Sequence, residues 1–125
     1  MDVVSVVREA AERYGGEIGL SYVIFFGSAV RGTLRPLSDV DIAVKFKAKP
    51  SLRALGAMLA DLEDALKRRI DVVILPVENY SLMFEIYGHG VFVWGDYAEY
   101  VKDKAKALDL YHDFVEHRRK HALSR

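Results

Sequence analysis

Two aspartates stand one residue apart at the start of an apolar run, in the stretch SDVDIAV that covers residues 38–44. An ionised carboxylate is costly to remove from water unless a cation or several hydrogen bonds compensate it. Side chains two apart on a strand point to the same face, so Asp39 and Asp41 would project together with Cα atoms about 6.5 to 7 Å apart. A divalent cation between them would remove their repulsion, and the pair therefore predicts a metal site at the mouth of a strand.

Magnesium fits this pair, with Mn²⁺ as a possible substitute. Mg²⁺ keeps most of its waters, takes one or two protein carboxylates and fills its remaining octahedral positions with substrate phosphate oxygens. A third carboxylate is needed if two metals, about 3.5 to 4 Å apart, are to clamp the attacking and leaving oxygens. Asp71 opens the run DVVIL much as Asp41 opens DIAV. We therefore expect adjacent strands to bring Asp71 alongside Asp39 and Asp41, as a catalytic and metal-binding triad.

A phosphate-binding corner is expected just before these acids. Gly27 ends an apolar run, and a glycine there lets the backbone approach a ligand closely. Ser28 can offer its hydroxyl and amide at the start of a short helical turn, where partial positive charge favours phosphate. Arg31 and Arg35 lie in the following loop, where either could hold a triphosphate tail, and Ser38 completes the predicted nucleotide site.

Each of these signals has an ordinary alternative. Gly-Ser after a strand is a common turn, Ser38-Asp39 alone favours a cap or turn, and Asp71 alone would be a surface carboxylate. A calcium-binding EF-hand loop is excluded, because it needs polar ligands and a glycine where this chain has the apolar residues 42–44. It is the conjunction of these features along one chain that favours a nucleotide site.

Periodicity and turn residues predict the elements that must position these side chains. SYVIFF, at residues 21–26, does not alternate, which is typical of a strand covered on both faces. Gly15 and Gly16 are expected to stop the first helix. The expected helices cover residues 2–14, 51–66 and 97–121 with a short one within 77–88, the strands cover 21–26, 40–46, 70–75 and 90–95, and a helical turn covers 28–32.

This order predicts an α+β fold of two layers, with a mixed sheet of about four strands and helices covering one face. At 125 residues, the chain is expected to form one domain over 1–125. Its 18 basic and 18 acidic residues cancel, so direct nucleic-acid binding is not expected, and no apolar run is long enough for a membrane span. The lack of cysteine and glutamine, with Asn79 as the lone asparagine, indicates a reducing cytoplasm and a thermophilic source.

The pattern Gly27-Ser28-x10-Asp39-x-Asp41, followed by Asp71 on a third strand, resembles the signature of the minimal nucleotidyltransferases, a small branch of the DNA polymerase β superfamily. The resemblance covers roughly residues 20–95. It implies that Gly27 and Ser28 contact nucleotide phosphates, that Asp39 and Asp41 bind metals, and that Asp71 completes the triad. The implied reaction transfers a nucleoside monophosphate, here AMP from ATP, to an acceptor hydroxyl and releases pyrophosphate. Asp71 would bind the second metal or take the acceptor proton.

A chain of this size also resembles the MNT antitoxins, which pair with a HEPN-domain ribonuclease toxin. That resemblance implies adenylylation of a tyrosine on the toxin. Two alternatives stay open: a module that neutralises its partner by contact alone, and a transferase acting on a small molecule. Core packing is the expected role for most of the apolar residues Met83, Phe84, Tyr87 and Trp94, with a partner surface as the alternative.

Overall fold

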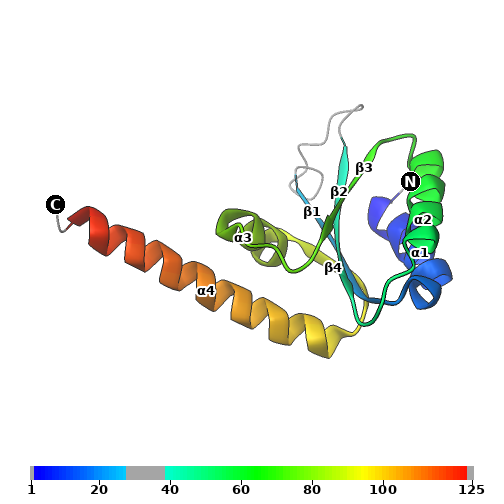
Figure 1. The fold of residues 1–125 in the computed structure, drawn as a ribbon. Coiled ribbons are helices and arrows are strands. Elements are labelled where there is room, and N and C mark those ends of the chain that lie inside the picture. Colours follow the sequence, from blue (N-terminus) through cyan, green and yellow to red (C-terminus); the bar gives the residue numbers. More distant parts are fainter. Residues whose placement is uncertain (1, 28–38, 124–125) are drawn as a thin grey trace.

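The computed structural model describes residues 2–27 and 39–123, and it has four helices and four strands in these ranges (Figure 1). In chain order the elements are α1 (Val3–Ile18), β1 (Leu20–Phe26), β2 (Val40–Phe46), α2 (Leu52–Leu66), β3 (Ile70–Ile74), α3 (Tyr80–His89), β4 (Val91–Gly95) and α4 (Tyr97–Leu123). The predicted strands and the three longer helices are present within a few residues of their expected ends. The predicted turn over 28–32 lies outside the described residues.

The four strands form one mixed sheet in the order β3-β2-β1-β4. β1 runs antiparallel to both β2 and β4, whereas β2 and β3 are parallel. A parallel pair needs a crossover connection, and α2 supplies it. Because β2 and β3 run in the same direction, both strands begin at the same end of the sheet.

Helices cover both faces of the sheet, which corrects the prediction that they cover only one (Figure 1). On the α1–α2 face, Val40 and Ile42 are fully buried against helices α1 and α2. On the α3–α4 face, Tyr22 and Ile24 of β1 are buried with residues of α3 and α4. The physical reason is β1, which is mainly apolar and whose every residue is buried: a strand that is hydrophobic on both sides needs a helix layer on each.

The first helix continues through Gly15 and Gly16, which were expected to stop it, and ends at Ile18. A Cβ atom on Gly15 would overlap the indole ring of Trp94, so this glycine lets α1 pack closely against β4. The helix ends instead at Gly19, whose φ of 86° lies in the left-handed region that favours glycine.

Side-chain caps fix where the middle helices begin. The Ser51 side chain accepts a hydrogen bond from the backbone N–H of Ala54 at the start of α2, and Asn79 does the same for Leu82 at the start of α3. The short helix expected within 77–88 is α3, which begins directly after its cap and spans Tyr80–His89.

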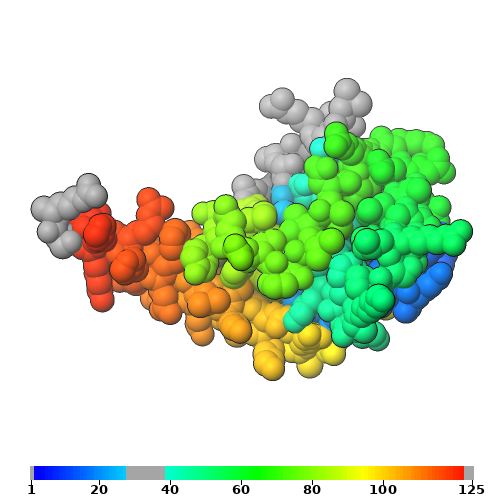
Figure 2. Space-filling view, viewed as in Figure 1, coloured from blue at the N-terminus to red at the C-terminus, as the bar shows by residue number. Residues whose placement is uncertain are grey.

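The last helix is much longer than the body of the molecule requires. α4 has 27 residues, against 10 in α3, and its C-terminal turns extend past α3 as an arm (Figure 2). Tyr80 and Phe84 of α3 stack on Phe114 and Tyr111 of α4, with ring centroids 4.7 and 4.4 Å apart. Across residues 2–27 and 39–123, no helix is apolar over a stretch long enough to cross a membrane.

Candidate active site

The register of the parallel strands brings two of the predicted acids face to face. Asp41 is the second residue of β2 and Asp71 the second residue of β3, and the two are direct partners in the ladder. The backbone N–H of Val40 donates to the carbonyl oxygen of Arg69 at 2.9 Å, which ties the beginnings of the strands together. Asp71 is thus beside Asp41 because the two strands start at the same level.

Both carboxylates also point to the same side of the sheet. Val40 and Ile42 flank Asp41 and are buried on the α1–α2 face, so Asp41 projects toward the α3–α4 face. Ile70 and Val72 flank Asp71 and likewise belong to the α1–α2 face. Asp39 directly precedes β2, and its carboxyl group is within hydrogen-bonding reach of that of Asp71. We call the set Asp39, Asp41 and Asp71 the carboxylate edge.

The carboxylate edge is electrostatically strained. Burial, then the charges of Asp71 and Asp39, raise the pKa of Asp41 above its ordinary value. The pKa of Asp71 is also raised, first by its hydrogen bond with Asp39 and then by burial and the negative charge of that neighbour. Arg69 Nε lies 3.8 Å from Asp71 Oδ1, but both side chains are well exposed and the pair offsets little of the repulsion.

Gly27 fits closely against this edge. It follows Phe26, which is the ladder partner of Asp41 across the antiparallel pair. Its φ of 90° lies in the left-handed region, and a Cβ atom there would overlap the Asp41 carboxylate. Only glycine satisfies both constraints. The other predicted nucleotide-binding residues, Ser28, Arg31, Arg35 and Ser38, lie outside the described residues.

The donor chemistry of the carboxylate edge fits a hard divalent cation, because carboxylate oxygens that repel one another are the ligands Mg²⁺ takes. A cation there would offset the mutual repulsion that helps to raise the pKa values of Asp41 and Asp71. In the part of the chain that the structure describes, no three acidic or histidine side chains already surround a single point as metal ligands do. The three acids of the carboxylate edge therefore lie near one another but do not form a complete set of metal ligands.

The α3–α4 face also contains a polar network that was not predicted from the sequence. Lys45 Nζ donates to Asp103 Oδ2 at 2.5 Å and pairs with Glu99 at 2.9 Å. The Tyr22 hydroxyl bonds to Asp103 at 2.8 Å and meets the Tyr87 hydroxyl at 2.5 Å. Its signal in the sequence is Lys45, a second charge, besides Asp41, inside a strand whose other residues are apolar. The polar network consists of Ser21, Tyr22, Lys45, Tyr87, Glu99 and Asp103.

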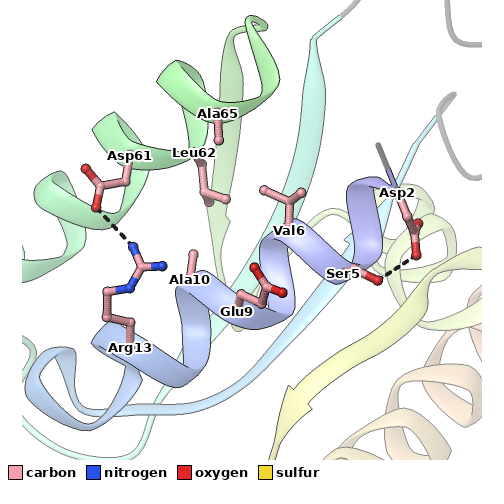
Figure 3. A pocket seen from close by; sticks show the side chains of 9 residues that line it. All are labelled: Asp2, Ser5, Val6, Glu9, Ala10, Arg13, Asp61, Leu62 and Ala65. Atoms are coloured by element: carbon pink, nitrogen blue, oxygen red, sulfur yellow. Dashed lines mark hydrogen bonds and ion pairs between the residues drawn. The ribbon is translucent and has the colours of Figure 1, made fainter.

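Among the hollows of the described part of the structure, two lie on opposite sides of the sheet. A small one of about 330 Å³ lies between α1 and α2, beside the ion pair of Arg13 and Asp61, and contains none of the predicted site residues (Figure 3). A larger one of about 650 Å³ lies on the α3–α4 face, and Lys45 and Asp103 of the polar network line it. The larger hollow thus shares its face of the sheet with the carboxylate edge.

Comparison with known proteins agrees with this architecture. The family model described as Polymerase beta, Nucleotidyltransferase matches residues 11–99. Protein adenylyltransferase MntA of Thermococcus cleftensis is 43% identical over 68 residues, which are 54% of this chain and 64% of that relative. The chain therefore spans slightly less than two thirds of the length of this curated relative.

Solved structures show the same fold. A toxin-antitoxin crystal structure with AMP-PNP superposes with a TM-score of 0.72 at 22% identity, covering 94% of this chain and 96% of the other. A structure of the tri-AMPylated HEPN toxin of Shewanella oneidensis in complex with MNT antitoxin gives a TM-score of 0.68 at 19% identity, covering 97% of each chain. Since the family model covers residues 11–99, which include all four strands of the sheet and helices α2 and α3, this chain belongs to the polymerase β nucleotidyltransferase family.

Proposed function

We propose that this protein is a metal-dependent adenylyltransferase that moves AMP from ATP to a hydroxyl group of a HEPN-domain toxin and so acts as its antitoxin. The observation that supports the proposal most strongly is the pairing of Asp41 with Asp71, which lie side by side on adjacent parallel strands and on one face of the sheet. The relative from Thermococcus, described as a protein adenylyltransferase, supports the reaction, and the toxin-antitoxin complexes support the partner.

The carboxylate edge would hold the metal through Asp39, Asp41 and Asp71. When bound, Mg²⁺ supplies positive charge that offsets the charge of the triphosphate and of the leaving pyrophosphate. The acceptor oxygen attacks the α-phosphorus, a new P–O bond forms, and the bond to the oxygen bridging the α and β phosphates breaks. Asp71 is the candidate to take the hydroxyl proton or to complete the metal's ligands, and its raised pKa suits the first role.

The remaining parts of the nucleotide site are proposed on the sequence pattern. Gly27 would let the backbone approach the phosphates, and Ser28, Arg31, Arg35 and Ser38 would contact the nucleotide. A single domain, a cytoplasmic location and a thermophilic source stay predictions from length and composition.

The test is the intact mass of the HEPN partner after incubation with this protein, Mg²⁺ and ATP. We expect the mass to rise by one or more adenylate groups, and we expect Asp39→Asn and Asp41→Asn to abolish the rise. Asp109→Asn, an exposed acid on α4, is the matched control and should leave the rise intact. If the partner is inhibited without any gain in mass, and both site variants still inhibit it, neutralisation occurs by contact and adenylyl transfer is ruled out.

A further inference from the structure

The larger hollow on the α3–α4 face is an open, mainly apolar cleft that the reaction above leaves unexplained. Its volume is about 650 Å³, within the range of binding clefts in proteins. Tyr80 and Leu110 at its margin are 37% and 40% exposed, so apolar surface of the cleft is accessible from solvent. The α3–α4 cleft is lined by Lys45, Leu75, Pro76, Val77, Glu78, Tyr80, Met83, Tyr87, Asp103, Lys106, Ala107 and Leu110.

The cleft and the carboxylate edge are at opposite ends of the same strip of sheet. On β2, Asp41, Ala43 and Lys45 alternate onto the α3–α4 face, so Lys45 is four residues from Asp41. Leu75, just after β3, is likewise four residues from Asp71. At the rise of an extended strand, the cleft begins about 13 Å from the acids.

Lys45 and Asp103, two of the four charged residues that line the cleft, are paired with each other, whereas Glu78 and Lys106 are exposed at the surface. Lys45 is held by Asp103 and Glu99, at 2.5 and 2.9 Å. Burial disfavours the charged form of Lys45, but these hydrogen bonds outweigh burial and raise its pKa. A phosphate group or a polycationic small molecule that bound to Lys45 or Asp103 would have to break this pairing, whereas an apolar side chain would not.

We propose that the α3–α4 cleft docks an apolar anchor of the acceptor protein, while the acceptor hydroxyl reaches the carboxylate edge. The identity of that acceptor as a HEPN-domain protein rests on the proposed function. The separation of about 13 Å sets the distance, in the acceptor protein, between the apolar anchor and the hydroxyl that is modified. The anchor lies about four residues from the modified hydroxyl in an extended segment, or about nine residues along a helix.

The experiment compares two variants of α4 in binding to the HEPN partner without nucleotide, measured by calorimetry. Leu110→Glu places a charge in the cleft, whereas Val115→Glu places the same charge on the same helix but outside the cleft. The two side chains are equally exposed, at 40% and 39%, so neither change removes a core residue. We expect Leu110→Glu to weaken binding at least about tenfold and Val115→Glu to change it little.

A second titration uses a non-hydrolysable ATP analogue with Mg²⁺ and no partner. We expect both variants to bind the analogue as the unchanged protein does. A loss of analogue affinity in Leu110→Glu alone would assign the cleft to the nucleotide and overturn the proposal, as would equal effects of the two variants on partner binding.

Failure of the proposed reaction and failure of the docking proposal give different results in these experiments. If the unchanged protein binds the partner but adds no adenylate, the proposed reaction fails while the docking result still decides the inference. If the unchanged protein does not bind the partner at all, both the antitoxin role and the docking proposal are wrong.

Discussion

The two faces of the sheet are built differently, although one set of strands makes both. The α1–α2 face is an apolar layer in which Val7, Ile42, Met58 and Leu62 are buried without polar partners. On the α3–α4 face, the Tyr22 and Tyr87 hydroxyls meet inside the core, and Lys45 bonds to α4 from the sheet. That face also carries the carboxylate edge and the cleft.

Stability and function are therefore assigned to different faces of the sheet in this fold. A close-packed apolar layer tolerates little change in side-chain volume and offers no reactive groups. The α1–α2 face can therefore hold the sheet in place without taking part in the reaction. Buried polar groups stabilise the folded state only if each has its hydrogen-bond partner. The polar network on the α3–α4 face therefore favours one specific packing arrangement but contributes less stability than the apolar layer. Substitutions on the two faces should therefore differ in both size and kind of effect.

The largest loss of stability is expected from Leu62→Ala on the α1–α2 face. Leu62 is 1% exposed, and removing its side chain leaves a cavity that should lower the free energy of unfolding by about 2–5 kcal/mol. Leu52→Ala, on the same helix but 65% exposed, is the control and should change it by less than about 0.5 kcal/mol. Denaturant unfolding measures both, and equal losses would contradict a core centred on this face.

A smaller loss is expected from Tyr22→Phe on the α3–α4 face. The change removes the hydroxyl that bonds to Asp103 and Tyr87 and leaves each of them one partner short, which should cost about 1–3 kcal/mol. Tyr14→Phe is the control, since the Tyr14 hydroxyl bonds to Asp61 at the surface. Unfolding curves that coincide for the two variants would mean that the polar network adds nothing.

Gly27→Ala should lower stability by about 1–2 kcal/mol, because an L residue is strained at positive φ. It should also push the Asp41 carboxylate aside and reduce adenylyl transfer. Gly56→Ala is a control of opposite sign: no atom lies within 4 Å of its added Cβ, and alanine in an exposed helix should stabilise by about 0.5–1 kcal/mol. Thermal melts and transfer rates of both variants separate strain from displacement of the acid.

The smallest effect is a pH dependence of the polar network. Hydrogen bonds from Ser21 and Lys45 lower the pKa of Glu99 below 4.5 in the folded state. Its contribution to stability is therefore present above pH 4.5 and is lost as the pH falls through the folded value. Lys45 has a pKa raised above 10.5, so its contribution is present below that pH and lost as the pH rises further.

Melting temperatures measured on the acid side should therefore fall less steeply for Glu99→Gln than for the unchanged protein. Glu12→Gln, on the exposed side of α1, is the control. If the slopes of all three proteins agree, the ion pair does not contribute to folding.

Much of the sheet could be predicted because its signals are local. The apolar runs of β1 and β2 and the Ser51 cap of α2 specify their elements within a few residues. The pairing of Asp41 with Asp71 also follows from a repeated pattern, an acid that opens each strand.

The errors came from contacts distant in the sequence. Gly15 was interpreted as a helix stop, but its role depends on Trp94, which packs against it from β4. The polar network joins residues 58 and 81 positions apart, so no local window contains it. The one-face prediction failed for another reason: residues 21–26 already indicate a strand covered on both faces, but the weak amphipathic periodicity of α3 and α4 does not reveal which face of the sheet they cover.

The proposed reaction requires the carboxylate edge to hold Mg²⁺ together with a nucleotide, and a calorimetric titration with a Mg²⁺-loaded, non-hydrolysable ATP analogue measures this binding. We predict saturable binding by the unchanged protein and by Asp109→Asn, and binding at least about tenfold weaker in Asp41→Asn and Asp71→Asn. We also predict that chelating the metal removes the difference between these proteins. Equal affinity in all four proteins, or no binding by the unchanged protein, would contradict the account.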